Sequence, residues 1–345
     1  MRLEHEEHLE REHIDQPMKK IAIIICWLGP LPDMFRLWCK SCAANPTVDW
    51  LLFTDQEPDN VPENIHVHRT SLEALAVLAR EKLRFPDLSL EKPYKLCDYK
   101  AMYGTIFSDY LYGYDFWGYC DIDMIFGDLR GFFTDELLER YDKLLACGHL
   151  SIYRNSPDVN ARYLLPGGKF SAEEVMRSPW NYAFDEWRGI FRIYKQNGFP
   201  MYEEVPYADI SWSHERFTLH RRSSSKYKAP PPDFNHQLFF YEDGRIYRAY
   251  IGDDGKVHQD QFLYIHLMKR KFPPVGADLE NCSAFYCTPS GFLPKKPGSL
   301  PEKREIRKLN PYYGFLFEKI ERSVRNKILK HRNHQTFVRR RQKNA

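Results

Sequence analysis

Residues 19–29 are KKIAIIICWLG, a short apolar run that ends in Gly29 and is followed by Pro30. A continuous apolar run of this length predicts a strand that is buried on both faces of a parallel sheet. The spacing of Met34, Leu37 and Trp38 then predicts a helix over residues 33–44. A strand followed directly by a helix is the repeating unit of an α/β protein.

The same alternation continues along the first half of the chain. DWLLFTD (49–55) and NIHVHRT (64–70) predict two more strands, and Ser71 is a suitable N-cap for a helix that ends near Leu83. A further helix is expected over 96–110, before the apolar run that leads into DFWGYCDIDMIFGD (115–128). We therefore expect an α/β fold with a central, mostly parallel sheet flanked by helices.

The second half has a less regular pattern. A hairpin is expected from Leu238 to Ile251 with its turn at Asp243-Gly244, and FLYIHLM (262–268) predicts another strand. These patterns divide the chain into a flexible leader (1–18), a single α/β domain (19–300) and a basic helical tail (301–345).

Composition places the chain among ordinary globular proteins, with 43% hydrophobic and 28% charged residues. No stretch approaches the about 20 apolar residues that cross a bilayer, and the N-terminus is too charged for a signal peptide. We therefore expect a cytoplasmic protein. Cys39 and Cys42 form a lone CxxC inside a predicted helix, which favours buried, reduced thiols over a zinc site.

The charge of the chain is uneven. Residues 318–345 contain ten Lys and Arg against two Glu, a net +8, so the rest of the chain carries −5 of the total +3. Phe317, Ile320, Val324 and Ile328 form an apolar stripe on this basic tail. Such a helix can lie on the anionic inner face of a membrane. A simply solvated terminal helix is the alternative. No nucleic-acid recognition motif accompanies it.

Asp121 and Asp123 are the strongest functional candidates. They stand one residue apart at the end of an apolar run, where two crowded carboxylates are costly unless a cation neutralises them. Mn²⁺ or Mg²⁺ would suit this pair and would stabilise the charge on a leaving diphosphate. A solvated turn with two carboxylates is the alternative interpretation.

The segments KLCDYKAMYG and FWGYCDIDMIFGDL resemble the A-type, nucleotide-diphospho-sugar transferase fold of glycosyltransferases. Within that fold the chain is similar to a bacterial group of uncharacterised glycosyltransferase-like proteins with the pattern YKLCDYK, WGYCDID and FGDL. The similarity extends over residues 20–275 and is most specific over 93–129. It implies that Asp123 binds the metal directly, and that Asp121 contacts the donor ribose or the metal through water.

The resemblance also implies roles for residues before the acid pair. Lys95 and Asp98 share one face of the predicted helix and would hold the nucleotide, with Lys100 beside them, unless they form only a helical ion pair. Asp55, at the end of the second strand, would bind the nucleoside or cap its own turn. Gly29, Asp55 and Asp121 all fall at the carboxyl ends of strands, where such sheets bind ligands.

Later residues complete the expected site. The resemblance implies that His266 returns to the metal while Lys269, with Arg270 next to it, contacts the diphosphate. A core histidine is the alternative for His266. Asp185 and Glu186 are candidates for the general base or for binding the acceptor hydroxyls, and Trp187 could stack on a sugar. The alternative there is a solvent-facing acidic pair beside a buried Trp.

The predicted activity is transfer of a sugar from a nucleotide-sugar donor, UDP-sugar by default, to a glycan or lipid-linked saccharide acceptor. A non-catalytic nucleotide-sugar binding module is one alternative. A phosphatase or phosphotransferase with an aspartate nucleophile is another, although that chemistry places its acid pair after the first strand. Binding of a specific nucleic acid is not expected.

Overall fold

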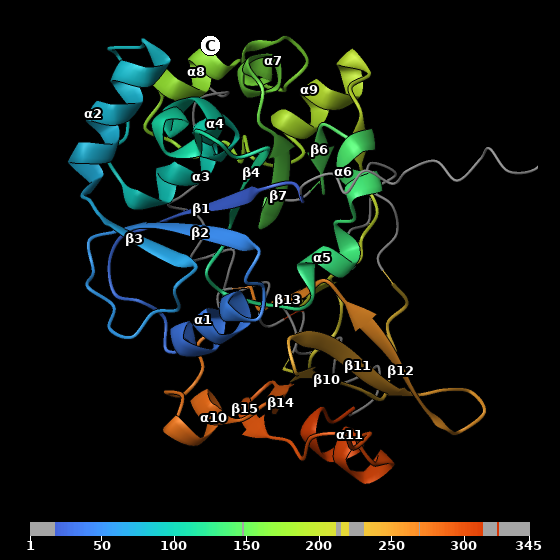
Figure 1. Ribbon diagram of the computed structural model, residues 1–345. Helices are drawn as coiled ribbons and strands as arrows, with labels where there is room; N and C mark the ends of the chain where they lie inside the picture. Colours follow the sequence, from blue (N-terminus) through green and yellow to red (C-terminus); the bar gives the residue numbers. More distant parts are fainter. Residues whose placement is uncertain are drawn as a thin grey trace, which may run out of the picture.

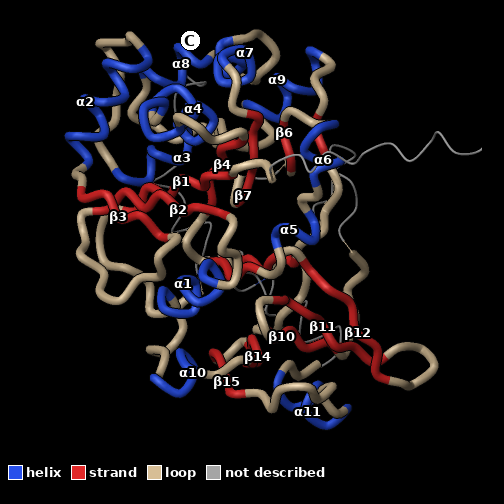
Figure 2. The backbone as a smooth tube through the Cα atoms, in the orientation of Figure 1, coloured by secondary structure: helices blue, strands red, loops and turns tan. Residues whose placement is uncertain are grey.

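The computed structural model describes residues 18–146, 148–211, 215–220, 231–268, 270–312 and 323. Figure 1 shows a large sheet between layers of helices, with a smaller antiparallel sheet on one side of this assembly. The tube in Figure 2 shows that the two sheets are separate and that most helices surround the large one. Residues 1–17 of the expected leader and most of the expected tail lie outside the described residues.

The large sheet has seven strands in the order β3-β2-β1-β4-β7-β6-β8. Strands β3, β2, β1 and β4 are parallel neighbours, whereas β7 is antiparallel to both β4 and β6. The prediction of a mostly parallel sheet therefore holds for the first half of the chain, and the whole sheet is mixed. Its strands are β1 (Ile21–Trp27), β2 (Val48–Thr54), β3 (Ile65–Arg69), β4 (Phe116–Cys120), β6 (Lys143–Leu144), β7 (Leu150–Arg154) and β8 (Met201–Tyr202).

Strand β1 is apolar throughout because both faces of the sheet are covered. Ala22 and Ile24 belong to one hydrophobic core, and Ile21, Ile23 and Ile25 belong to the core on the other face. The first core is covered by α2 (Leu72–Leu83), α3 (Leu96–Tyr99), α4 (Tyr103–Ile106), α7 (Pro157–Ala161), α8 (Ala172–Arg177) and α9 (Ile190–Asn197). The second is covered by α1 (Phe35–Ala43), α5 (Leu129–Phe132) and α6 (Asp135–Arg140).

Several local predictions are confirmed. The oxygen of the Ser71 side chain caps α2 by accepting from the backbone N–H of Ala74. Cys39 and Cys42 are buried free thiols in α1, and burial raises the pKa of Cys39 to about 12. Among the described residues, no helix has the length and apolar character that a membrane crossing requires.

The prediction of one continuous helix over 96–110 is wrong in detail. The chain forms α3 and α4 with a 3₁₀ turn between them at Lys100–Met102 and another after α4 at Ser108–Leu111. Gly104 explains part of this irregularity, because a Cβ there would lie 2.5 Å from the Trp117 ring of β4. Close packing against the sheet, rather than helical periodicity, sets the backbone here.

The last third of the described chain forms a five-stranded antiparallel sheet in the order β12-β11-β10-β14-β15. The expected hairpin is confirmed as β10 (Gln237–Glu242) and β11 (Arg245–Ile251), with positive φ at both Asp243 and Gly244 as a two-residue type I′ turn requires. The other elements are β12 (Val257–Phe262), α10 (Ala277–Asn281), β14 (Ala284–Thr288), β15 (Gly291–Pro294) and α11 (Lys303–Leu309). Strands β14 and β15 are not among the elements expected from the sequence pattern.

A third, small sheet connects the other two. It contains β5 (Met124–Phe126), β13 (Tyr264–His266) and β9 (Ala208–Asp209), in the order β5-β13-β9. The single strand expected over 262–268 is divided, because the chain leaves β12 at Phe262 and enters the small sheet at Tyr264. This change of sheet brings the end of the domain back to the residues that follow β4.

Candidate active site

The acid pair, Asp121 and Asp123, lies in the short connection between β4 and β5. The backbone N–H of Asp121 donates to the carbonyl of His149 at 2.9 Å, and the carbonyl of Asp123 accepts from Leu267 at 2.9 Å. Ile122 between them is fully buried, whereas the side chains of Asp121 and Asp123 are 34% and 16% exposed. The buried isoleucine therefore anchors the connection and leaves both carboxylates accessible.

The small sheet brings His266 to this pair. His266 lies opposite Met124, the residue after Asp123, in the antiparallel β13–β5 pairing. Its Nε2 is 3.5 Å from Oδ1 of Asp123. Burial acts to lower the pKa of His266, but Asp123 and Asp209 outweigh it and raise that pKa to about 10.

Ligand atoms of Asp121, Asp123 and His266 all lie within 4.8 Å of one another. Two partly exposed carboxylates and one imidazole form a mixed oxygen and nitrogen donor set, which fits Mn²⁺ or Mg²⁺ with room left for phosphate or water oxygens. The sequence predicted these three residues as one group, and the fold brings them together from positions more than 140 residues apart.

Lys100 joins the acid pair to a second acidic segment. Its ammonium group donates to Oδ1 of Asp121 at 2.6 Å and to the carbonyl of Gly148 at 2.9 Å, and lies 3.6 Å from Oδ2 of Asp185. The side chain is almost completely buried. Lys100 therefore fixes the orientation of Asp121 and balances its charge together with that of Asp185.

Asp185 and Glu186 follow residues 180–184 in a loop. We call residues 180–186 the acidic loop. Burial raises the pKa of the Asp185 carboxyl well above its usual range, against the opposing effect of Lys100. Glu186 is half-buried next to it. A Cβ at Gly148 would lie 2.7 Å from Oδ2 of Asp185 and 2.7 Å from Cγ of Glu186, so the two segments are in close contact.

Lys95 and Asp98 form a buried clamp that holds the acidic loop. The Lys95 ammonium donates to Asp98 at 2.8 Å and to the carbonyls of Val175 and Trp180 at 2.8 and 2.7 Å. Asp98 accepts from the backbone N–H groups of Tyr182 and Phe184. The pair is therefore not an exposed helical ion pair, and the three donor hydrogens of Lys95 have acceptors inside the protein.

The remaining predicted residues lie around this centre. Asp55 ends β2 and accepts from the N–H of Gly29 at 2.9 Å, and hydrogen bonds from Gln56 and Gly29 lower its pKa. Trp187 is half-buried against the core, under the Arg188 guanidinium. Arg270 donates to the carbonyl of Ser211 at 2.7 Å. Lys269, predicted to contact the diphosphate, lies outside the described residues.

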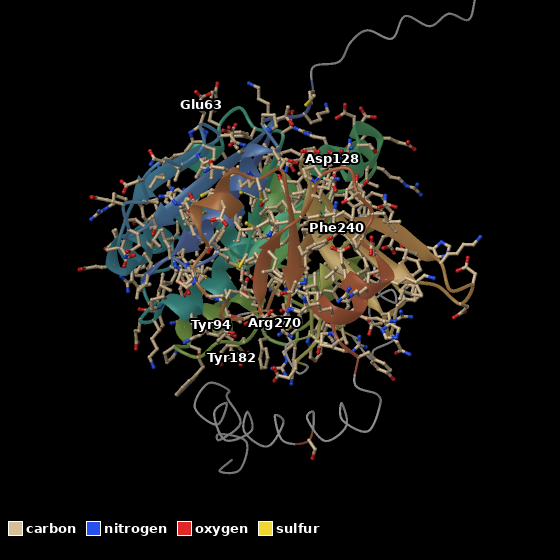
Figure 3. All side chains as sticks on the ribbon, turned by 90° about the horizontal axis from the view of Figure 1, so that it is seen from below. Glu63, Tyr94, Asp128, Tyr182, Phe240 and Arg270 are labelled. Atoms are coloured by element: carbon tan, nitrogen blue, oxygen red, sulfur yellow. The ribbon has the colours of Figure 1, made fainter. Side chains whose placement is uncertain are left out.

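Figure 3 shows Tyr94, Tyr182 and Arg270 along one edge of the molecule, with Glu63 at the opposite edge. Tyr94 precedes Lys95 of the clamp, and Tyr182 belongs to the acidic loop. Tyr94 and Trp180 are about half exposed, at 47% and 48%. One large exposed aromatic side chain therefore belongs to the acidic loop, and another directly precedes Lys95 of the clamp.

Sequence reasoning missed His149 and Asp209. His149 precedes β7, and Asp209 ends β9; both are buried, and with His266 they form a second group whose ligand atoms lie within 4.8 Å of one another. Neither residue stands in a local motif. Only the pairing of β9 with β13 and of β7 with β4 places them beside His266.

No significant match to a curated protein was found. A family model does match residues 23–296, which include most of β1, the acid pair, His266 and the second sheet. The chain therefore belongs to the family of unknown function DUF6625.

Proposed function

We propose that this protein is a metal-dependent glycosyltransferase. It would move a sugar from a nucleotide-diphosphate sugar, UDP-sugar by default, to a hydroxyl of a glycan or lipid-linked saccharide. The observation that carries the proposal is the convergence of Asp121, Asp123 and His266 at the carboxyl end of β4, with their ligand atoms within 4.8 Å. Open sheets with parallel strands bind ligands at this end.

The topology supports the finer assignment to the A-type glycosyltransferase fold. Four parallel strands in the order β3-β2-β1-β4 precede the acid pair, an antiparallel β7 follows, and a late strand returns a histidine to the pair. This arrangement agrees with the resemblance in residues 93–129. Fold alone does not decide activity, so the proposal depends on the site.

The residues of the site can be given roles on this basis. Asp123 and His266 would hold Mn²⁺ or Mg²⁺, and Asp121, oriented by Lys100, would contact the ribose or complete the metal shell. When bound, the cation supplies positive charge against a leaving diphosphate. Asp55 follows β2 and bonds Gly29, which follows β1. Its carboxylate would accept a hydrogen bond from a nucleoside that lies across the strand ends.

The acceptor side of the reaction is assigned to the acidic loop. Asp185 and Glu186 are the candidates for the general base or for binding acceptor hydroxyls. Glu186 is the better candidate for taking a proton, because it is half-buried whereas Asp185 is buried beside the ammonium of Lys100. Lys95 and Asp98 then act on the nucleotide only indirectly, by holding this loop.

A location in the cytoplasm, with the basic tail on the inner face of a membrane, is part of the same proposal. The tail carries a net +8 over 318–345, which would attract anionic lipids next to a lipid-linked acceptor.

The test is a thermal-shift screen of the full chain with nucleotides and nucleotide-sugars, each with and without Mn²⁺. We expect one nucleoside diphosphate to raise the melting temperature further only when Mn²⁺ is present, and we expect Mn²⁺-dependent release of that diphosphate from its sugar. Asp123→Asn should abolish both effects. Glu63→Gln, the same acid-to-amide change at an exposed position on the opposite edge, should abolish neither.

Other outcomes separate the alternatives. A metal-dependent shift with no release of diphosphate, with or without acceptor, would indicate a binding module. Release of inorganic phosphate from phosphate esters would indicate a phosphatase. Absence of any shift under every metal condition would refute the proposal.

A further inference from the structure

Asp209 and His266 face each other directly in the small sheet. They are paired residues in the parallel β9–β13 register, and His266 is also paired with Met124, the residue after Asp123, on its other side. Met124, His266 and Asp209 therefore form a row across the small sheet, and Asp123 directly precedes Met124. The imidazole of His266 lies between the carboxylates of Asp123 and Asp209, which come from distant parts of the chain.

The two ring nitrogens of His266 lie at different distances from the carboxylates that they face. Nδ1 is 2.8 Å from Oδ1 of Asp209, which is a hydrogen bond, whereas Nε2 is 3.5 Å from Oδ1 of Asp123. Two atoms bound to one ion about 2.1 Å away lie about 3.0 Å apart at a right angle and about 3.4 Å apart at the tetrahedral angle. The Asp123 side thus has the spacing of two metal ligands, and the Asp209 side has the spacing of a donor and its acceptor.

His149 restrains the ring from a third direction. Its imidazole stacks on that of His266, with centroids 4.4 Å apart and planes 21° apart. Its Nδ1 is 2.8 Å from the hydroxyl of Tyr264, and its Nε2 faces Oδ2 of Asp209 at 3.9 Å. Tyr207 stacks on Tyr264 at 4.9 Å and closes the cluster. All five residues are at most 7% exposed.

We infer that Asp209 is a positioning residue for metal binding, with His149 supporting it. Asp209 accepts the Nδ1 proton of His266 and so directs the lone pair of Nε2 toward the acid pair. A carboxylate that orients a ligating histidine in this way also makes the imidazole a better donor. The inference rests on the proposed metal site and names the residues that make His266 competent for it.

The experiment measures the binding of Mn²⁺ alone to the full chain, by the EPR signal of free Mn²⁺. Asp209→Leu should weaken Mn²⁺ binding by about 10- to 100-fold. Asp209→Asn should fall between Leu and wild type, because its amide keeps an acceptor but loses the charge. Asp254→Asn is the matched control, since Asp254 bonds His258 at 2.9 Å on the surface and far from the acid pair in sequence, and it should bind as wild type.

A second measurement needs no variant. In the wild-type chain with ¹⁵N-labelled histidines and Cd²⁺, we expect the metal on Nε2 of His266 and a proton on Nδ1. Metal on Nδ1 would overturn the inference, because the ion would then lie among His149, Asp209 and His266.

The failures are distinguishable. If wild type binds Mn²⁺, Asp123→Asn does not, and folded Asp209→Leu binds like wild type, then the positioning role is refuted and the metal site stands. If wild type binds neither Mn²⁺ nor Cd²⁺, the proposed metal site and the positioning role are both refuted.

Discussion

The ammonium of Lys100 lies 2.6 Å from Oδ1 of Asp121 and 3.6 Å from Oδ2 of Asp185, so one buried cation joins the acid pair to the acidic loop. Burial opposes the charge on Lys100, yet Asp121 and the neighbouring acids raise its pKa well above the usual value. Lys100 therefore remains charged, and the site is a connected network of charges rather than a set of independent carboxylates.

Lys100→Met should destabilise the protein and reorient Asp121. Methionine fills the volume but leaves the carbonyl of Gly148 without this donor and Asp185 without this cation, which costs about 1–3 kcal/mol. Urea unfolding in EDTA measures this loss. Lys82→Met is the control, because Lys82 bonds the exposed Asp109 at the surface and should change stability by less than about 0.5 kcal/mol. Equal effects of the two substitutions would contradict a structural role for Lys100.

Asp98→Ala, which breaks the buried clamp under the acidic loop, should be among the most destabilising single changes around the site. It leaves Lys95 buried and unpaired and removes the acceptor of two backbone N–H groups, a loss of about 3–5 kcal/mol. Chemical denaturation measures this loss.

The double change Lys95→Met with Asp98→Leu is the control for that experiment. It removes both charges together, so it should cost less than Asp98→Ala alone. A double variant less stable than the single one would show that hydrogen bonds to the loop, rather than the unpaired charge, dominate.

Gly148→Ala tests the contact between the metal site and the acidic loop. The new Cβ would meet the side chains of Asp185 and Glu186 at 2.7 Å, so these side chains must shift. Asp121, Asp123 and His266 are expected to keep their places. We expect sugar transfer to fall by tenfold or more, since a displacement of about 1 Å can cost 100-fold. Affinity for Mn²⁺ should stay within about twofold. Loss of Mn²⁺ binding instead would place Gly148 in the metal site.

Asp185 should give the folded protein a characteristic pH dependence. Its folded pKa is raised, so between the unfolded carboxyl pKa of about 3.9 and the folded value the native state binds more protons than the unfolded state. Its contribution to stability is complete below about pH 4 and is lost as the pH rises through the folded pKa.

Asp185→Asn removes this titration. Melting temperatures measured in EDTA should therefore decline less for Asp185→Asn than for wild type as the pH rises above about 4. Parallel curves for the two proteins would show that Asp185 ionises normally.

Local signals predicted most of the first half of the fold and one hairpin of the second half. The apolar run of β1, the N-cap Ser71 and the turn Asp243-Gly244 each carry their structure in a few neighbouring residues, and each was confirmed. The segment 96–110 failed because Gly104 packs against Trp117, a contact that no helical periodicity reveals.

The available chemistry can be read from the amino-acid order alone: two carboxylates after a buried strand, and a histidine at the end of a later one. Which of these groups meet depends on how distant segments pack. It placed Lys95 and Asp98 under the acidic loop instead of toward the strand ends, and it brought Asp209 and His149 to His266. The physical reason is that strand registers and side-chain burial are set by packing between distant segments, and local spacing contains no record of those contacts.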